Sequence, residues 1–174
     1  MLKHFEKMLA VFPFSKLAKR GPVVRVYALE HSEPPLFERE LPAGTDAKTL
    51  LAAAREFMHK DCSCEVDSAW DLWDFDGKEW KLAPISVTLF CYGPAFDNEN
   101  GDQLRIEFGV DSRFLPAPGF EGAMRMGQSN IRSLLHLSDE IERKIQPSKR
   151  KLWSESGANF ADVLRQTLGT LHVN

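Results

Sequence analysis

Alternation of apolar and polar residues with a period of two is the feature that most restricts how this chain can fold. Between residues 62 and 72, alternate positions form a mostly apolar set: Cys62, Cys64, Val66, Ser68, Trp70 and Leu72. The intervening positions are mostly polar: Ser63, Glu65, Asp67, Ala69 and Asp71. Residues 103–110 alternate in the same way. This pattern is typical of strands with one buried and one wetter face, and it predicts an antiparallel sheet.

Length and composition favour a single globular domain. The chain has 174 residues, of which 43% are hydrophobic and 27% charged. That balance fits a soluble folded protein and argues against a disordered tail, and the length is enough for one well-packed core. The formal net charge of −3 provides no general basic excess to attract nucleic acid. We therefore expect one domain over residues 1–174, and the charge disfavours a nucleic-acid partner.

Cysteine usage and hydropathy indicate a cytoplasmic location. Cys62, Cys64 and Cys91 cannot form a disulfide framework without leaving one thiol over, which favours a reducing compartment. Residues 1–20 mix lysine and glutamate with apolar residues, so they lack the uninterrupted apolar core of a signal peptide. No stretch approaches the roughly 18 apolar residues of a membrane span, and we expect no membrane contact.

The N-terminal half predicts two helices and two strands. Apolar residues recur at helical spacing from Leu2 to Phe12 and the helix ends at Pro13, so residues 1–20 form a helix and its connector. Residues 23–30 predict a strand, and residues 36–41 a second strand whose flanking prolines favour a sheet edge. A helix opens at residues 44–46, with the apolar stripe Leu50, Leu51, Ala54, Phe57 and Met58.

The remainder predicts three strands followed by helices. The strand from Cys62 to Phe75 is followed by Asp76-Gly77, a hairpin turn signal whose two-residue loop would pair Trp73 with Trp80. The return strand reaches residue 92, with a bulge or kink at Pro84, and a further strand covers 103–111. The segment 120–174 is expected to be helical. Its first stripe stops at Pro147 and consists of Ile131, Leu134, Leu135, Ile141 and Ile145. A last helix would begin after Ser154 or Ser156 and bury Phe160, Val163, Leu164, Leu168 and Leu171.

Because the strands cluster instead of alternating with helices, the fold class is predicted to be α+β. We expect a mostly antiparallel sheet of about five strands in a single domain, with helices packed on one face.

Metal-ligand residues occur together, but their spacing argues against a metal site. His59, Cys62 and Cys64 carry zinc-binding groups, and Cys91 would have to supply the fourth ligand. The H-x2-C-x-C spacing is not a common zinc motif, and both cysteines are in phase with Val66, as expected of small buried side chains. Residues 74–79 and 97–102 resemble fragments of a calcium loop but lack its bidentate glutamate. We predict neither metal nor cofactor.

The outward sheet face provides the candidate site. It would carry aromatic, basic and acidic side chains together, a composition favoured at interaction centres: Arg25, Tyr27, Thr88, Phe90, Tyr92, Arg105 and Glu107. Either this face is exposed and binds a partner, or a second layer such as the terminal helices covers it.

No catalytic motif is found: the chain contains neither a nucleophile elbow nor a phosphate-binding loop. The sequence therefore favours a non-catalytic interaction module that binds another protein, or its own copy as a homodimer, through the sheet face or an edge. The alternative is a small-molecule site or an enzyme with an acidic pocket containing Glu65, Asp67, Asp71 and Glu107. A weaker alternative is nucleic-acid binding by the basic segment from Arg143 to Trp153, although cations also favour the carboxyl end of a helix.

Overall fold

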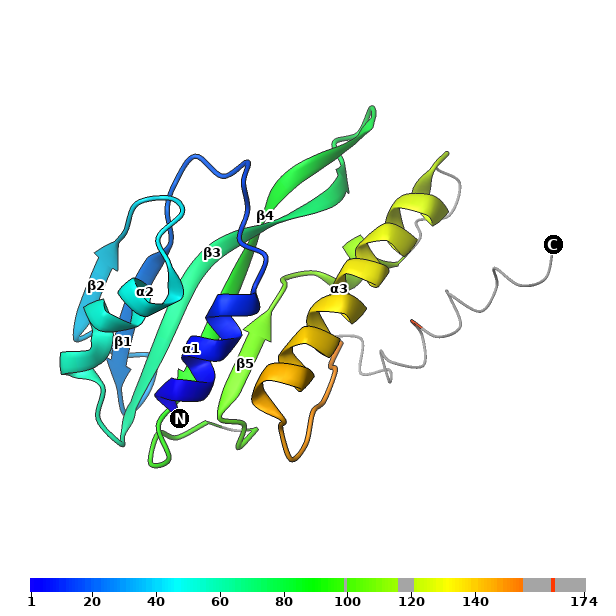
Figure 1. Ribbon diagram of the computed structural model, residues 1–174. Helices are drawn as coiled ribbons and strands as arrows, with labels where there is room; N and C mark the ends of the chain where they lie inside the picture. Colours follow the sequence, from blue (N-terminus) through cyan, green and yellow to red (C-terminus); the bar gives the residue numbers. More distant parts are fainter. Residues whose placement is uncertain (99, 116–120, 155–163, 165–174) are drawn as a thin grey trace. The chain divides into compact units, whose positions relative to one another are not determined.

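The computed structural model describes residues 1–98, 100–115, 121–154 and 164 (Figure 1). It confirms the predicted α+β class. Helices pack on a five-stranded antiparallel sheet in which the strands have the order β2-β1-β3-β4-β5. The strands are β1 (Val23–Ala28), β2 (Phe37–Glu40), β3 (Cys62–Phe75), β4 (Trp80–Tyr92) and β5 (Leu104–Glu107). The helices are α1 (Leu2–Val11), α2 (Ala47–Ala54) and α3 (Ala123–Ile145), with 3₁₀ turns at Arg55–Phe57 and Asp111–Phe114.

Two compact units make up the chain. Unit 1 comprises Met1–Asp71 and Pro84–Phe108, and unit 2 comprises Leu72–Ala83 and Gly109–Asn174. The long strands β3 and β4 each contribute residues to both units. The single domain expected from the sequence remains a prediction. The predicted last helix lies outside the described residues except for Leu164, which is buried.

In unit 1, α1 and α2 cover one face of the sheet (Figure 1). The helix α2 begins at Asp46, whose Oδ1 accepts a hydrogen bond from the Thr49 backbone N–H at 3.0 Å and so satisfies one free amide of the first turn. The apolar sides of both helices are buried together with the inner residues of the strands. This core contains Phe5, Met8, Leu9, Leu50, Leu51, Val24, Val26, Cys64, Val66, Val87 and Leu89.

The strand register separates the two faces as the period-two pattern predicts. Val26 is paired with Cys64 and both side chains are fully buried, whereas the adjacent pair, Arg25 and Glu65, points to the opposite face. The edge position predicted for residues 36–41 is also confirmed, because β2 is the first strand of the sheet.

Several element ends differ from the sequence predictions. The strand predicted over 23–30 stops at Ala28, because Leu29 adopts a left-handed backbone with φ of 65°. The last strand is only Leu104–Glu107, since Gly109 has φ of 72° and a 3₁₀ turn begins at Asp111. Both local reversals are incompatible with an extended ladder.

The hairpin turn is displaced by one residue from its predicted position. Asp76 N–H donates to the Glu79 carbonyl at 3.2 Å, so Gly77 and Lys78 are the central residues. The ring contact is accordingly between Phe75 and Trp80, with centroids 5.3 Å apart, and the predicted pairing of Trp73 with Trp80 is wrong. The physical reason is that Asp76 caps the turn with its side chain: Oδ1 accepts from the amides of Lys78 and Glu79 at 3.0 Å each.

Unit 2 contains α3, whose apolar stripe includes Leu137 in place of the predicted Leu135. Ile131, Leu134 and Leu137 are buried, but Leu135 is 40% exposed. Each residue turns a helix by about 100°, so Leu135, directly after the buried Leu134, lies off the stripe.

Buried Asn130 connects three parts of unit 2. Its Oδ1 accepts from the Trp73 N–H at 2.9 Å, and its Nδ2 donates to the carbonyls of Trp73 at 2.9 Å and Arg113 at 2.8 Å. Asn130 is almost fully buried, so its side-chain amide has little access to water as an alternative partner. Asn130 thereby links α3 to the end of β3 and to the 3₁₀ turn at Asp111–Phe114.

We predict that Asn130→Ala destabilises the protein by about 1–3 kcal/mol, because three buried hydrogen bonds lose one partner. Urea unfolding followed by far-UV circular dichroism measures the change. Arg132→Ala, two residues along at an exposed position of the same helix, should change the free energy of unfolding by less than about 0.5 kcal/mol. Equal effects of the two variants would contradict the role assigned to Asn130.

Candidate functional site

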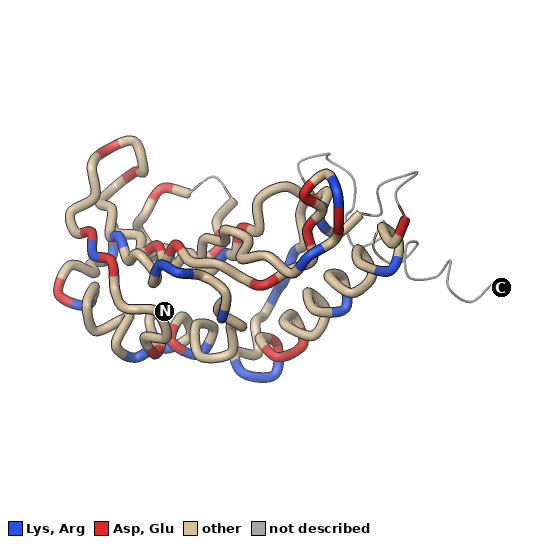
Figure 2. Tube along the Cα trace, turned by 90° about the horizontal axis from the view of Figure 1, so that it is seen from above, with Lys and Arg blue, Asp and Glu red and all other residues tan. Residues whose placement is uncertain are grey.

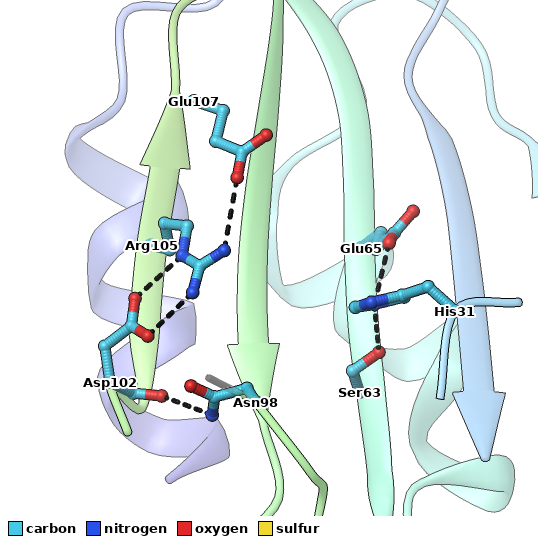
Figure 3. Close-up of polar contacts among 7 residues, drawn as sticks. All are labelled: His31, Ser63, Glu65, Asn98, Asp102, Arg105 and Glu107. Carbon is cyan, nitrogen blue, oxygen red and sulfur yellow. Dashed lines mark hydrogen bonds and ion pairs between the residues drawn. The ribbon is translucent and has the colours of Figure 1, made fainter. Parts of the chain in front are cut away.

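The candidate site is the sheet face of unit 1 opposite α1 and α2, called the outer face below. Figures 1 and 3 show the strands from opposite sides, with these helices in front in Figure 1 and behind in Figure 3. The register brings side chains of four strands onto this face, through the pairs Arg25 with Glu65, Tyr27 with Ser63, Thr88 with Glu107 and Phe90 with Arg105. All seven residues predicted from the sequence therefore belong to one surface.

Arg25 is held between two carboxylates at one end of the outer face. Its Nε contacts Glu38 on β2 and its Nη1 contacts Asp67 on β3. The hydrogen bonds that Arg25 donates, first to Glu38 and then to Asp67, raise the pKa of the guanidinium. Asp67 also accepts a hydrogen bond from Thr88 Oγ1 at 2.8 Å, so this cluster connects β2, β1, β3 and β4.

Arg105 forms a second group on the other side of β4 (Figure 3). Its Nε and Nη2 each lie 2.9 Å from a different carboxylate oxygen of Asp102, and its Nη1 lies 3.3 Å from Glu107. The guanidinium also lies 5.1 Å from the ring centroid of Tyr92 and 6.0 Å from that of Phe90. Forked hydrogen bonds and aromatic stacking are the contacts that arginine makes best, so this side chain is fixed.

Aromatic rings fill the space between the two arginine groups. Phe90, Tyr92 and Phe96 are buried together, with Tyr27 packed against them. Burial raises the pKa of both tyrosines. The sequence left open whether this face is exposed or covered. The described residues place segments of unit 1 itself over it, through His31 from the segment after β1 and Phe96 from the segment after β4.

His31 makes the contact on this face with the greatest scope for acid–base chemistry. Its Nε2 lies 3.0 Å from Ser63 Oγ and 3.0 Å from Glu65 Oε1 (Figure 3). The imidazole ring also contacts Tyr27 and Phe96, with centroid separations of 5.1 and 5.0 Å. Ser63 is fully buried and the Glu65 side chain is 12% exposed, whereas His31 is 38% exposed.

Burial disfavours charge on both members of the His31–Glu65 pair. Burial is the main cause that raises the pKa of Glu65 to about 7; the nearby carboxylates of Asp67 and Glu107 act in the same direction, and Arg25 opposes them. Burial also lowers the pKa of His31, and the positive charge of Arg105 contributes in the same direction. Both shifts favour a hydrogen bond between uncharged groups over an ion pair in this contact.

The group is not a catalytic triad despite its residue types. In a triad, the histidine contacts the nucleophile through one ring nitrogen and the carboxylate through the other. Here Ser63 and Glu65 share Nε2, and the serine hydroxyl is inaccessible. The arrangement can store or exchange a proton but does not activate Ser63.

The four acids proposed for an acidic pocket do not all converge. Asp67 and Glu107 are close enough to Glu65 to raise its pKa. Asp71 is engaged elsewhere: it contacts the Ser15 hydroxyl and accepts from the Lys16 N–H at 2.9 Å. It thus anchors the segment that follows α1.

The cysteines belong to the core of unit 1. Cys62, Cys64 and Cys91 are buried free thiols, and burial raises the pKa of Cys91 to about 12. A thiolate, the form that binds zinc, is disfavoured there. His59 is exposed, and the described residues contain no group of three or more potential metal ligands.

The basic segment after α3 belongs to unit 2 and is partly neutralised. Figure 2 shows acidic and basic positions intermingled along α3, with basic residues following its end. Arg150 lies 2.7 Å from Glu142, Arg143 contacts Glu140, and Lys151 lies over the Trp153 ring at 5.1 Å. These contacts reduce the charge available to a phosphate backbone.

Sequence reasoning missed five contributors to the site: Glu38 and Ser63 on the strands, and His31, Asp102 and Phe96 in connecting segments. His31 and Asp102 lie outside the strands, and their contacts depend on how segments fold back. Phe96 offered a signal, because it is an apolar residue within the otherwise polar stretch 93–102, and it is buried.

Comparison of the chain with protein-family models, curated proteins and solved structures gives no match. Within the described part of the chain, no helix has both the length and the apolar character needed to cross a membrane.

We predict that Glu65→Gln stabilises the protein at pH 8 but not at pH 4. The pKa of Glu65 rises from 4.5 to about 7 on folding, so folding disfavours its ionised form. The wild type accordingly loses stability as pH rises from about 4.5 to 7, and an uncharged glutamine avoids that loss. We expect a gain of about 1–3 kcal/mol at pH 8.

Urea unfolding at pH 4, 6 and 8 measures this dependence. Glu56→Gln, a substitution at an exposed position, is the matched control and should leave the profile of stability against pH unchanged. A gain from Glu65→Gln that is the same at all three pH values would show that the carboxyl is not perturbed by burial.

Proposed function

We propose that the protein is an interaction module whose outer face binds a lysine- or arginine-rich segment of a partner protein. The observation that carries the proposal is the charge distribution of this face. Both of its arginines are already held by carboxylates, and the acidic groups outnumber them. The carboxylates are those of Glu38, Glu65, Asp67, Asp102 and Glu107.

Accessibility supports the same proposal. Glu38 and Glu107 lie near opposite ends of the outer face, on β2 and β5, and are 55% and 52% exposed. A cationic side chain that reaches these carboxylates is attracted to them, whereas an anionic side chain is repelled by the net negative charge of the face. Tyr27 and Arg105 retain partial exposure and supply the aromatic and planar contacts common in interfaces. Phe90 and Tyr92 support the surface from below.

A second candidate is a small-molecule site that uses acid–base chemistry. The observation favouring it is the pair of Glu65 and His31, because a carboxyl with a pKa of about 7 is suited to proton transfer at neutral pH. Native mass spectrometry of protein purified gently from cell extract separates the candidates. A co-purifying small molecule supports this second function, and a bound protein supports the first.

We predict that the double substitution Glu38→Gln with Glu107→Gln weakens binding of a fluorescent oligolysine peptide about fivefold or more at low salt. Each lost charge removes about 0.5 kcal/mol of attraction. Fluorescence anisotropy at pH 8 measures the affinity.

The matched control is Glu6→Gln with Glu56→Gln, which changes the net charge equally at α1 and just after α2. If both double variants weaken binding by the same factor, the peptide responds to overall charge and the outer face is not the site.

A further inference from the structure

The segment between β1 and β2 is attached to the outer face by a small number of contacts. Its first turn is closed by hydrogen bonds from Leu29 N–H to the Asp61 carbonyl at 3.0 Å and from Glu30 N–H to the Ala28 carbonyl at 2.7 Å. It rejoins the sheet where Leu36 N–H donates to the Val26 carbonyl at 2.8 Å. Leu29 has φ of 65°, a left-handed conformation that is energetically unfavourable for residues other than glycine.

His31 is the principal anchor of the intervening stretch. Among the described residues from 31 to 35, it alone makes a side-chain hydrogen bond or ring contact with the sheet. Its ring lies among four aromatic side chains with centroid separations between 5.0 and 6.1 Å: Tyr27, Phe90, Tyr92 and Phe96. The position of the whole stretch therefore depends on whether this ring can stay there.

We propose that His31, Ser63 and Glu65 form a proton-dependent latch that holds the segment 29–36 on the outer face. As the pH falls, protonation of this latch lowers the affinity of the outer face for cationic partners. The effect on binding rests on the proposed function. The latch itself is a property of the free protein.

The titratable and charged groups around the latch determine its direction. The charged and titratable groups near His31 or Glu65 lie on four of the five strands. They are Arg25 and Tyr27 on β1, Asp67 on β3, Tyr92 on β4, and Arg105 and Glu107 on β5. Arg105 opposes a positive charge on His31, and Glu107 favours it. Asp67 and Glu107 oppose a negative charge on Glu65, and Arg25 favours it.

Three protonation states follow from these groups. At high pH, neutral His31 donates from Nε2 to the Glu65 carboxylate, and Glu65 adds to the negative charge of the face. When the pair takes up one proton, the Glu65 hydroxyl donates to Nε2 and the contact persists without that charge. A second proton makes Nε2 a cationic donor facing a neutral carboxyl among buried rings, so solvent becomes the better environment for the imidazolium.

Both protonation steps weaken the attraction for a cation. The first removes a negative charge from the outer face, and the second adds a positive charge beside it as the segment 29–36 is released; both charge changes disfavour a cationic partner. The side chains of an oligolysine peptide stay protonated throughout the range from pH 5.5 to 8.5, so a pH dependence of its binding in that range reports on the protein.

The latch is tested first on the free, full-length protein by NMR. We expect the His31 ring carbons and the Glu65 carboxyl carbon to show the same two titration steps, because strongly coupled groups share apparent pKa values. The exchange rate of the Leu36 amide, relative to its intrinsic rate at the same pH, should increase through the lower titration step. Independent, single-step titrations of the two groups, or unchanged exchange at Leu36, would overturn the latch.

Variants isolate the contribution of each partner. Glu65→Gln retains a donor and an acceptor but has no charge to lose, so His31 should titrate in one step. His31→Gln should abolish the lower step at Leu36. His59→Gln, at an exposed histidine outside the site, is the control and should leave both steps unchanged.

Peptide binding then tests the consequence. Wild-type affinity for oligolysine should fall about threefold to tenfold between pH 8.5 and 5.5, whereas Glu65→Gln combined with His31→Gln should vary less than twofold. Equal pH dependence in wild type and double variant would overturn the regulatory role. Coupled titration without any peptide binding would instead leave the latch standing and reject the proposed function.

Discussion

The antiparallel pairing of β1 with β3 is the constraint on which the rest of unit 1 depends. It sets Val26 opposite Cys64 on the helix-covered side and Arg25 opposite Glu65 on the other. A slip of one residue would exchange these sets and place charged groups under α1 and α2. The free energy of burying the apolar set therefore also determines which ionisable groups meet on the outer face.

Those ionisable groups acquire different properties from small differences in surroundings. Glu65 and Asp67 are two residues apart on the same face of one strand. Asp67 contacts Arg25 and receives a hydrogen bond from Thr88, whereas Glu65 lies beneath His31 and beside the aromatic cluster. Burial without an arginine in contact raises the pKa of Glu65 to about 7, while Asp67 is held as the partner of a cation. Position on the sheet thus separates a carboxylate paired with arginine from one whose pKa is raised by burial.

The aromatic side chains give the outer face its mixed character. Phe90 and Tyr92 project from β4 between the two arginine groups, and Phe96 folds back over them. By excluding water they strengthen the electrostatic interactions nearby, and they provide a firm base for His31 and Arg105. A face of charged side chains alone would be solvated and would leave the histidine and the glutamate near their ordinary titration ranges.

The sequence alone determined the fold class, most elements and the composition of the candidate face, because side-chain period and turn chemistry are local properties. Arg25, Tyr27, Thr88, Phe90, Tyr92, Arg105 and Glu107 share one face since alternation in an antiparallel sheet leaves no other arrangement. The turn at Asp76 was displaced by one residue, because the same side chain suits two adjacent positions of a turn.

Only the tertiary structure decided what the face can do. It brought His31 to Ser63 and Glu65, residues more than thirty positions away, and folded Phe96 onto Tyr92. It also placed Asp71 apart from the other acidic residues, in contact with the Ser15 hydroxyl. These contacts depend on the path of the connecting segments, which the alternation of side chains does not encode. Burial is the main cause of the shifted pKa values of His31 and Glu65, and it arises only when the chain has folded.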